Sequence, residues 1–164
     1  DTAGTSRTFH TVSGRDVALT GPYGWKIDQA GEAAALSQLI ASTTESQIKE
    51  PLYSQSAVQR SGSAWGNTYV EIDLTGQHVY MIQEGAVVWD APCVTGNVAK
   101  NYTTPEGIYS LTYKEKDRIL RGAKQADGSY EYESHVDYWM PFNGGIGLSD
   151  ANWRGSFGGT IYQT

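Results

Sequence analysis

One cysteine and three histidines are the side chains of this sequence best suited to nucleophilic or acid–base chemistry. The cysteine is Cys93, and the histidines are scattered at His10, His78 and His135. One cysteine cannot form an internal disulfide, and no Cys/His cluster has zinc-site spacing, so we predict no metal and no cofactor. Cys93 lies in an apolar, strand-like stretch, where a free cysteine is usually inert. We therefore expect Cys93 to pack rather than to react.

The C-terminal part of the chain is dense in aromatic residues and glycine. Its large aromatic side chains are Tyr138, Trp139, Phe142, Trp153 and Phe157. Such residues either line a peptide-binding groove or fill a core. We expect Trp153 and Phe157 to serve mostly in packing, and Tyr138 and Trp139 to lie nearer a groove.

Composition limits the classes of protein to which the chain can belong. Its 164 residues are 39% hydrophobic and carry a net charge of −6. The apolar fraction is sufficient for a core and too high for a disordered chain. The acidic balance excludes nucleic acid as a partner, because phosphates would find no neutralising surface. There is no apolar run of membrane-spanning length and no signal peptide at the start, as expected of a mature, processed chain.

The N-terminal third predicts a small α+β module at residues 1–62. Residues 11–19 alternate apolar and polar types, which indicates one edge strand. Apolar residues at helical spacing predict an amphipathic helix over 29–42, with Asp28 as its N-cap and Glu32 near the positive end of its dipole. Residues 54–67 are polar and read as a linker.

Residues 63–164 predict a second, mainly β domain. Short strand patterns separated by turns indicate a meander. The expected strands are 69–74, 78–82, 86–89 with a continuation at 93–95, and 108–113. The charged stretch 114–132 reads as a surface hairpin or insertion. We expect mixed strand pairing in a sheet that is open on one side.

Four C-terminal strings are specific when taken together. They are Val-Asp-Tyr-Trp-Met-Pro-Phe at 136–142, Gly-Gly-Ile-Gly-Leu at 144–148, Ser-Asp-Ala-Asn-Trp-Arg at 149–154 and Phe-Gly-Gly at 157–159. This set resembles the L,D-transpeptidase catalytic domain of the YkuD type, whose members cross-link peptidoglycan. Upstream pieces agree in family order, namely 69–74 with Gln-His at 77–78, Val-Thr-Gly at 94–96, and Thr-Pro-Glu-Gly-Ile-Tyr at 104–109. Residues 23–28 and 50–53 resemble the peptidoglycan-binding module that precedes this domain in some Gram-positive members.

The resemblance implies a β-sandwich-like fold, incomplete at the C-terminus, and cysteine-dependent acyl transfer. In such enzymes a thiolate attacks the bond after the third stem-peptide residue and expels the terminal D-alanine. The acyl group then passes to an amine of a neighbouring stem, which forms a 3-3 cross-link. This chemistry needs a thiol, a base and donors for an oxyanion.

The sequence departs from the family pattern at both catalytic positions. Ser149 occupies the position of the family's general-base histidine, just before Asp150. The family's Ser/Thr-His-Gly-Cys motif, which carries the nucleophile, would fall beyond Thr164. We therefore expect residues 1–164 by themselves to be inactive. Because Ser149 replaces the histidine, Asp150 is expected to cap a turn rather than to orient a base.

The resemblance also implies a substrate groove and its partners. The groove residues it implies are Tyr138, Trp139, Met140, Gly145, Asp150 and Trp153. The implied partners are donor and acceptor stem peptides of peptidoglycan and, for an intact member, carbapenem β-lactams. The implied location is the extracellular cell wall, with anchoring through an N-terminal segment absent here.

Three hypotheses follow from these observations. The first is an L,D-transpeptidase whose C-terminal segment is missing. The second is a non-catalytic peptidoglycan-binding homologue that has lost the general base. The third is a structural or adhesion β-domain without a peptide site.

Overall fold

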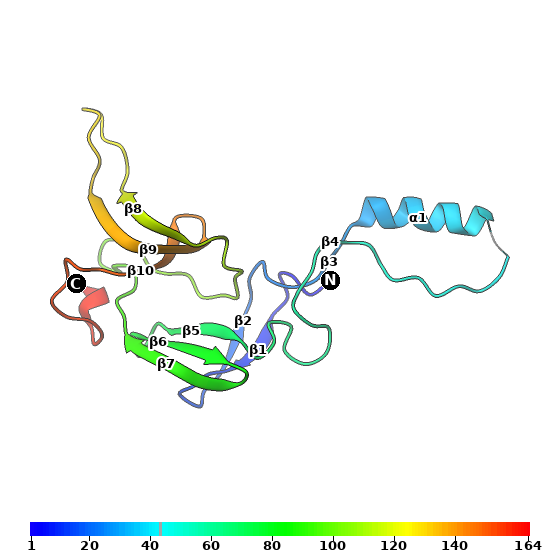
Figure 1. Ribbon diagram of the computed structural model, residues 1–164, viewed down its shortest axis with the longest axis horizontal. Helices are drawn as coiled ribbons and strands as arrows, with labels where there is room; N and C mark the ends of the chain where they lie inside the picture. The colour runs from blue at the N-terminus through cyan, green and yellow to red at the C-terminus, as the bar shows by residue number, and fades with distance from the viewer. Residues whose placement is uncertain (43) are drawn as a thin grey trace. The chain divides into compact units, whose positions relative to one another are not determined.

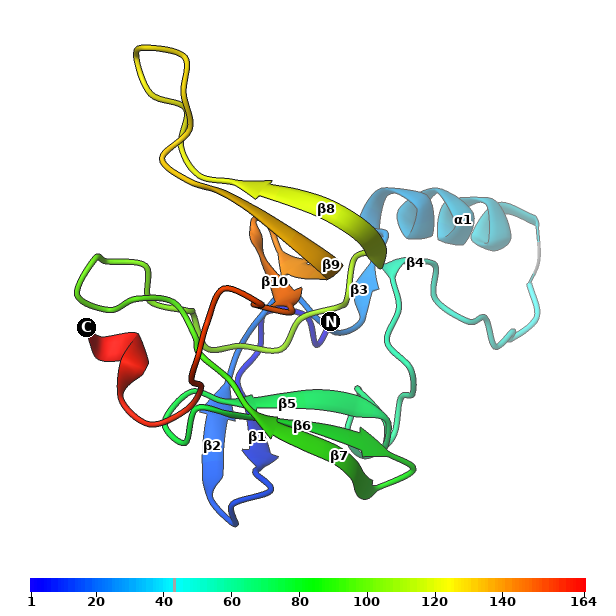
Figure 2. The same cartoon turned by 60° about the vertical axis from the view of Figure 1, so that its left-hand side comes forward.

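The computed structural model describes residues 1–42 and 44–164 and is mainly β (Figures 1 and 2). The elements are β1 Arg7–His10, β2 Asp16–Leu19, β3 Lys26–Ile27, α1 Gln29–Ser42, β4 Tyr53–Gln55, β5 Tyr69–Asp73, β6 His78–Gln83, β7 Ala86–Pro92, β8 Glu115–Arg121, β9 Glu133–Asn143, β10 Ile146–Ser149 and the 3-10 helix η1 Ile161–Gln163. They confirm the mainly β fold class and the helix over 29–42.

The chain forms two compact units. Unit 1 comprises Asp1–Glu71, Tyr80–Asp90 and Glu106–Ile108. Unit 2 comprises Ile72–Val79, Ala91–Pro105 and Tyr109–Thr164. The domain boundary between residues 62 and 63 stays a prediction.

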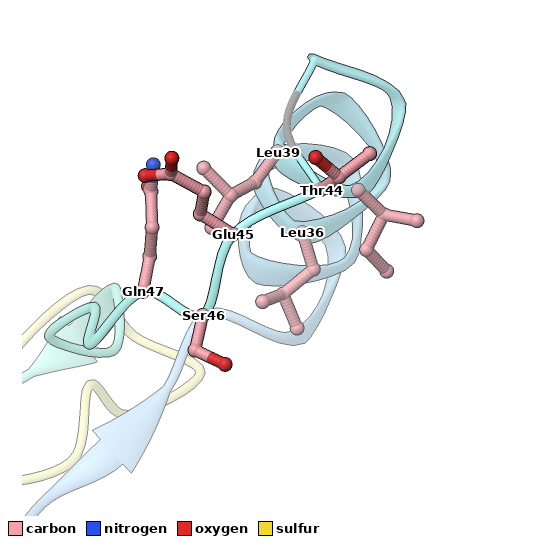
Figure 3. A pocket seen from close by; sticks show the side chains of 7 residues that line it. Leu36, Leu39, Thr44, Glu45, Ser46 and Gln47 are labelled. Atoms are coloured by element: carbon pink, nitrogen blue, oxygen red, sulfur yellow. The ribbon is translucent and has the colours of Figure 1, made fainter.

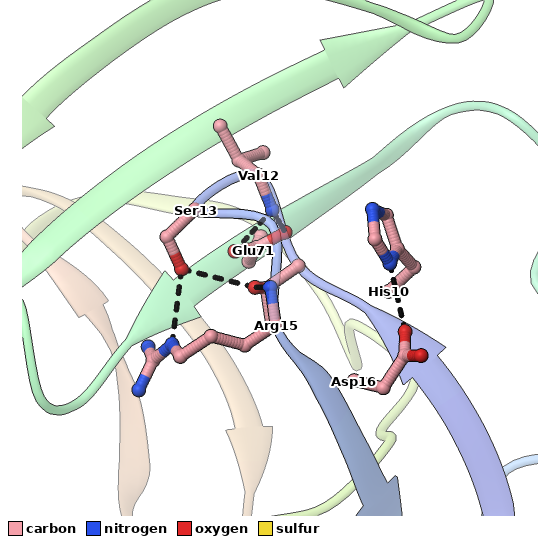
Figure 4. A network of polar contacts seen from close by, with 7 residues as sticks. His10, Val12, Ser13, Arg15, Asp16 and Glu71 are labelled. Atoms are coloured by element: carbon pink, nitrogen blue, oxygen red, sulfur yellow. Dashed lines mark hydrogen bonds and ion pairs between the residues drawn. The ribbon is translucent and has the colours of Figure 1, made fainter.

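The expected edge strand at 11–19 is instead the turn and second strand of a hairpin. β1 and β2 pair antiparallel, with His10 opposite Asp16. The chain reverses because Gly14 adopts φ 80° and donates its N–H to the Thr11 carbonyl at 2.9 Å. The buried carboxylate of Glu71 accepts the Val12 N–H at 3.1 Å, which fixes the turn on β5 (Figure 4).

Helix α1 begins as the sequence predicts. The Asp28 carboxylate accepts the Gly31 N–H at 3.0 Å and acts as the N-cap. The Glu32 carboxylate accepts hydrogen bonds from Lys49 Nζ at 2.6 Å and from the Leu52 N–H at 2.8 Å. These bonds tie the first turn of the helix to the segment that follows it.

The amphipathic interpretation of α1 is wrong as far as burial is concerned. No residue of the helix is buried, and Leu36 and Ile40 are exposed. They line a pocket of about 350 Å³ with residues 44–47 (Figure 3). The apolar spacing therefore predicts the helix correctly without predicting what covers it.

The meander of short strands is confirmed as the sheet β5–β6–β7. Its two turns contain residues in the left-handed region, Gln77 at φ 49° and Glu84 at φ 52°. Two expected strand segments are absent. β7 ends at Pro92, and residues 108–113 contain no strand. The backbone of 108–113 makes single hydrogen bonds instead of a ladder, such as Thr112 N–H to the Pro141 carbonyl at 2.8 Å.

The sheet β10–β9–β8 occupies unit 2. β8 pairs antiparallel with β9 from Glu115–Trp139 to Arg121–Glu133, so the charged stretch 114–132 does enter a hairpin. Figure 2 shows its loop extending beyond the paired strands. The pairings β1–β2, β3–β4, β8–β9 and β9–β10 are all antiparallel, in contrast to the mixed pairing expected.

The predicted linker at 54–67 is an anchored part of unit 1. The Tyr23 hydroxyl accepts the Val58 N–H at 3.0 Å and donates to the Ala64 carbonyl at 3.2 Å. The Trp25 indole donates to the Gln59 carbonyl at 3.0 Å. A polar composition indicated a free segment, but these aromatic side chains hold it in place.

Candidate active site

β9 and β10 place the family-like strings of the C-terminal part side by side. Ser149 lies opposite Trp139, and Leu148 lies opposite Met140. Successive residues of a strand point to opposite faces. Accordingly, Trp139 is 8% exposed while its neighbour Tyr138 is 51% exposed. Tyr138 carries the Lys116 ammonium over its ring, 5.4 Å from the centroid.

Among the aromatic side chains, the exposure of Tyr138 agrees with the predicted division, whereas Trp139, Trp153 and Phe157 depart from it. Trp139 packs, whereas Trp153 and Phe157 are 51% and 42% exposed. Tyr138 and Trp139 cannot both face one groove, because strand alternation separates them. Trp153 and Phe157 lie in the irregular segment after β10, where no strand pairing places them in a core.

Gly147 makes room for the Trp139 indole. A Cβ at Gly147 would lie 2.7 Å from Trp139 Cη2 and 2.7 Å from the Met140 carbonyl oxygen. The register of the β9–β10 pair shifts between Ile146 and Gly147. By contrast, a Cβ at Gly145, in the tip of the hairpin, would meet nothing within 4 Å.

Asp150 anchors the segment after β10 to β9. Its carboxylate accepts the Tyr138 N–H at 2.8 Å. Burial acts to raise the Asp150 pKa, but hydrogen bonds from backbone N–H groups, Tyr138 first, and the nearby His135 charge outweigh it and leave the pKa lowered. The predicted turn-capping role is therefore replaced by a strand-to-strand anchor. Ser149 is exposed beside it.

Cys93 is held as part of the scaffold of unit 2. Its N–H donates to the Gln77 carbonyl at 2.8 Å, and its own carbonyl accepts the Gly158 N–H at 2.9 Å. Burial, and then the charge of Asp73, raises the pKa of the Cys93 thiol. A raised pKa leaves little thiolate near neutral pH, in agreement with a packing role.

Gln77 is a fully buried polar side chain that sequence reasoning missed. Its amide nitrogen donates to the Leu74 carbonyl at 2.7 Å and to the Thr95 hydroxyl at 2.8 Å, and its amide oxygen accepts the Thr95 N–H at 2.9 Å. The Gly96 N–H in turn donates to the Thr104 hydroxyl at 2.9 Å. The upstream strings quoted above therefore meet in one hydrogen-bonded cluster. The sequence signal that could have predicted this cluster was that all these strings belong to the same family pattern.

The same cluster positions the C-terminal segment. Gly158 bonds to Cys93, the Val98 N–H donates to the Tyr162 carbonyl at 2.8 Å, and the Asn97 amide donates to the Thr164 carbonyl at 2.6 Å. Residues 157–164 are thus fixed on residues 93–98 at three points. This is the stretch that precedes the nucleophile motif in the family pattern.

A second group missed from the sequence is the pair His135 and Asp117. His135 Nε2 lies 2.6 Å from Asp117 Oδ1 across β8 and β9. This hydrogen bond, opposed by slight burial and supported by the charges of Asp117, Asp137 and Asp150, raises the His135 pKa. Both side chains are exposed, and neither occupies the position of Ser149.

In the described residues, no group of three or more His, Cys, Asp or Glu side chains is arranged to hold an ion. In the same residues, no helix has the length and hydropathy of a membrane span.

Comparison with known proteins places these features in a family. The family model of the YkuD L,D-transpeptidase catalytic domain matches residues 67–163. No curated protein matches the chain. A cysteine-to-serine mutant of Enterococcus faecium L,D-transpeptidase, solved by crystallography, superposes with a TM-score of 0.78 at 29% identity, over 99% of this chain and 63% of that one.

Two further structures agree with this match. The Ldtfm–avibactam carbamoyl enzyme gives a TM-score of 0.78 at 29% identity, over 99% of this chain and 62% of that one. The NMR structure of the E. faecium catalytic domain acylated by ertapenem gives 0.50 at 35% identity, over 60% and 74%. This chain spans a little under two thirds of the first two of these three chains. Together with the family match, these likenesses show that the chain belongs to the YkuD L,D-transpeptidase family.

Proposed function

We propose that this chain is the larger part of a peptidoglycan L,D-transpeptidase that forms 3-3 cross-links by cysteine-dependent acyl transfer. The observation that carries the proposal is the catalytic-domain match over 67–163. Hydrogen bonds of Gln77 to Leu74 and Thr95, which join motif strings of this domain, add support. The substrates are donor and acceptor stem peptides, and the site of action is the extracellular cell wall.

The 164 residues by themselves carry the scaffold without a competent nucleophile. Cys93 is their single thiol, and its pKa is raised by burial. Ser149, at the general-base position, has no useful basicity near neutral pH. The E. faecium catalytic domain is acylated by ertapenem, and we expect no such adduct on residues 1–164.

Mass spectrometry after incubation with a carbapenem tests this expectation. The 164-residue chain should keep its mass, as should a Cys93→Ser control. A stoichiometric gain that maps to Cys93 and is absent from the control would show that Cys93 is the nucleophile.

The role of Ser149 is tested in a chimaera that extends Thr164 with the Ser/Thr-His-Gly-Cys region of the E. faecium relative. With Ser149 retained, acylation should be slow, because an unassisted cysteine carries little thiolate. Adding Ser149→His should raise the acylation rate at least about a hundredfold, a typical contribution of a positioned general base. Equal rates would show that the base lies elsewhere.

Ser149 also favours a second candidate, a non-catalytic wall-binding homologue. Such a protein would keep the groove and lose the chemistry. It would bind isolated muropeptides, and the chimaera would remain unreactive with either residue at 149. A structural β-domain would show neither binding nor acylation.

A further inference from the structure

Unit 1 contains a cavity whose lining residues all precede residue 67, where the match to the family domain begins. Its volume is about 400 Å³, within the range of small-molecule sites. It lies between β1 and the loop 60–65, and Trp25, directly before β3, forms part of its wall. The side chains that matter below are Arg7, Arg60, Trp25, Trp65, Thr2 and Ser63.

The cavity is basic although the chain is acidic. Two arginines and no acidic residue line it, in a chain whose net charge is −6. Arg60 is engaged by Glu50 at 2.8 Å, and both are largely exposed. Arg7 has no ion pair with any described carboxylate, and its Nη2 donates to the Tyr23 carbonyl.

Arg7 is an incompletely satisfied cation. Its Nε and Nη1 are shielded from solvent and have no hydrogen-bond partner among the described residues. Arg7 is half-buried and its guanidinium lies 5.9 Å from the centroid of the Trp65 ring. Shielding two of its nitrogens from water without an acceptor is costly. An anionic group in the adjoining cavity would supply that counter-charge.

The walls around Arg7 are fixed before any ligand arrives. The Trp25 indole N–H is held by the Gln59 carbonyl, and the Trp25 backbone N–H donates to the Thr2 hydroxyl at 2.9 Å. The Trp65 ring packs on Phe9, with centroids 5.5 Å apart. A rigid site loses little conformational entropy on binding.

We propose that this cavity binds the carboxylate of a small ligand, whose apolar part rests against the two indoles. Arg7 contributes its positive charge from the wall of the cavity, since its Nη2 is bonded to Tyr23 and its other two nitrogens are shielded. Arg60, Thr2 and Ser63 line the cavity and add further polar groups. The choice of probes rests on the proposed wall function, because peptidoglycan offers carboxylates both on its muramyl sugars and at its peptide ends.

Titration of the whole 164-residue chain, followed by NMR of the tryptophan indole N–H signals, tests the site. The probes are N-acetylmuramic acid against N-acetylglucosamine, and N-acetyl-D-alanine against its amide. At least one acid should shift the Trp25 or Trp65 signal, and its neutral counterpart should not. Whichever acid binds identifies the sugar or the peptide as the source of the carboxylate.

Substitutions connect the binding to Arg7. Arg7→Met should weaken acid binding at least about tenfold, the loss expected for a charge-assisted contact. Arg60→Gln, at the exposed side of the cavity, should weaken it less and serves if Arg7→Met fails to fold. Arg118→Met, in β8, removes the same charge from a residue that does not line the cavity and should leave binding unchanged.

Three results would overturn the proposal: no probe binds, acids and neutral counterparts bind alike, or inorganic phosphate binds as well as the acids. These outcomes are distinguishable from failure of the proposed function, which is judged by acylation chemistry in unit 2. The cavity could bind its ligand in a protein that never transfers an acyl group. Equally, a protein that transfers an acyl group could have a cavity that binds nothing.

Discussion

At the scale of single residues, the buried amide of Gln77 joins several of the family-like strings by hydrogen bonds. Gln77 adopts φ 49° at the end of a turn and is fully buried, two features that disfavour glutamine unless its amide is satisfied. Its three side-chain hydrogen bonds satisfy it and join the β5–β6 turn to residue 95. The Gln77 backbone carbonyl accepts the Cys93 N–H, and the Cys93 carbonyl in turn accepts the Gly158 N–H.

Gln77→Asn should lower the free energy of unfolding by about 2 kcal/mol, because the shorter amide cannot reach Thr95 and leaves buried groups unpaired. Asparagine tolerates the left-handed backbone, so the loss reports on reach rather than on strain. Urea denaturation measures it. Gln83→Asn, at an exposed site in β6, should change stability by less than about 0.5 kcal/mol. Equal losses in the two variants would contradict this account.

His135 should titrate above its usual pKa of about 6.5, because Asp117 stabilises the imidazolium. Its contribution to stability is fully present below pH 6.5 and is lost as pH rises through the raised folded-state pKa. NMR titration of the imidazole signals measures the pKa. Asp117→Asn should bring it down, and an unchanged His135 pKa in that variant would rule out the pair as the cause.

At the scale of elements, the β9–β10 hairpin depends on close packing between strand backbone and indole. Gly147 has no side chain where the Trp139 ring and the Met140 carbonyl approach. The shift in register next to Gly147 changes which residues face one another. These two features bear on the placement of Tyr138 and Ser149, the positions proposed for the groove and for the general base.

Gly147→Ala should cost about 1–3 kcal/mol, because the new methyl group overlaps backbone that cannot move away freely. Thermal or urea unfolding gives the difference. Gly145→Ala is the matched control, since a Cβ there meets nothing within 4 Å, and it should be nearly neutral. A neutral Gly147→Ala would show that the hairpin is more adaptable than its geometry indicates.

Helix α1 is held at its first turn rather than by its apolar face. Glu32→Gln should speed hydrogen exchange at the Leu52 amide, because a neutral acceptor replaces the carboxylate. In the unmodified chain the same loss should occur as pH falls through the Glu32 pKa, which the Lys49 hydrogen bond lowers first of all. Exchange at the Asp28 amide, bonded to the Leu52 carbonyl, is the internal reference. Unchanged Leu52 exchange in the variant would count against the anchor.

At the scale of the whole molecule, acidic charge and an apolar strand edge act against each other. A net charge of −6 opposes self-association. β7 lies at the edge of its sheet and exposes Val87, Val88 and Trp89. Exposed apolar edges favour pairing with other chains.

Light scattering across pH should therefore show most association near the isoelectric point of about 4.9, where repulsion vanishes. Val88→Lys should reduce it by charging the edge of β7. Gln83→Lys adds the same charge in β6 and should reduce it less. Equal behaviour of the two variants would assign the effect to net charge alone.

The sequence by itself determined the family, the mainly β class, helix α1 with its Asp28 cap, and the three-stranded meander. The family came from a resemblance of ordered motif strings. The fold class, the helix and the meander follow from local patterns, because strand alternation, helical spacing and capping depend on neighbours a few residues away. The sequence did not determine which aromatic side chains pack. Tyr138 and Trp139 are adjacent in the chain, yet Tyr138 is exposed and Trp139 is buried. Trp153 is exposed and lies in the segment after β10, which pairs with no strand.

Only the tertiary structure brought Gln77 to Thr95, Asp117 to His135, and Arg7 to the cavity beside Trp25. The hydrogen bonds of these side chains join residues 16 or more positions apart in the sequence. Local spacing along the chain does not predict such contacts. Burial then decides the chemistry. It raises the pKa of Cys93 and leaves two nitrogens of Arg7 without a hydrogen-bond partner among the described residues, because the free energy of a polar group depends on what surrounds it in space.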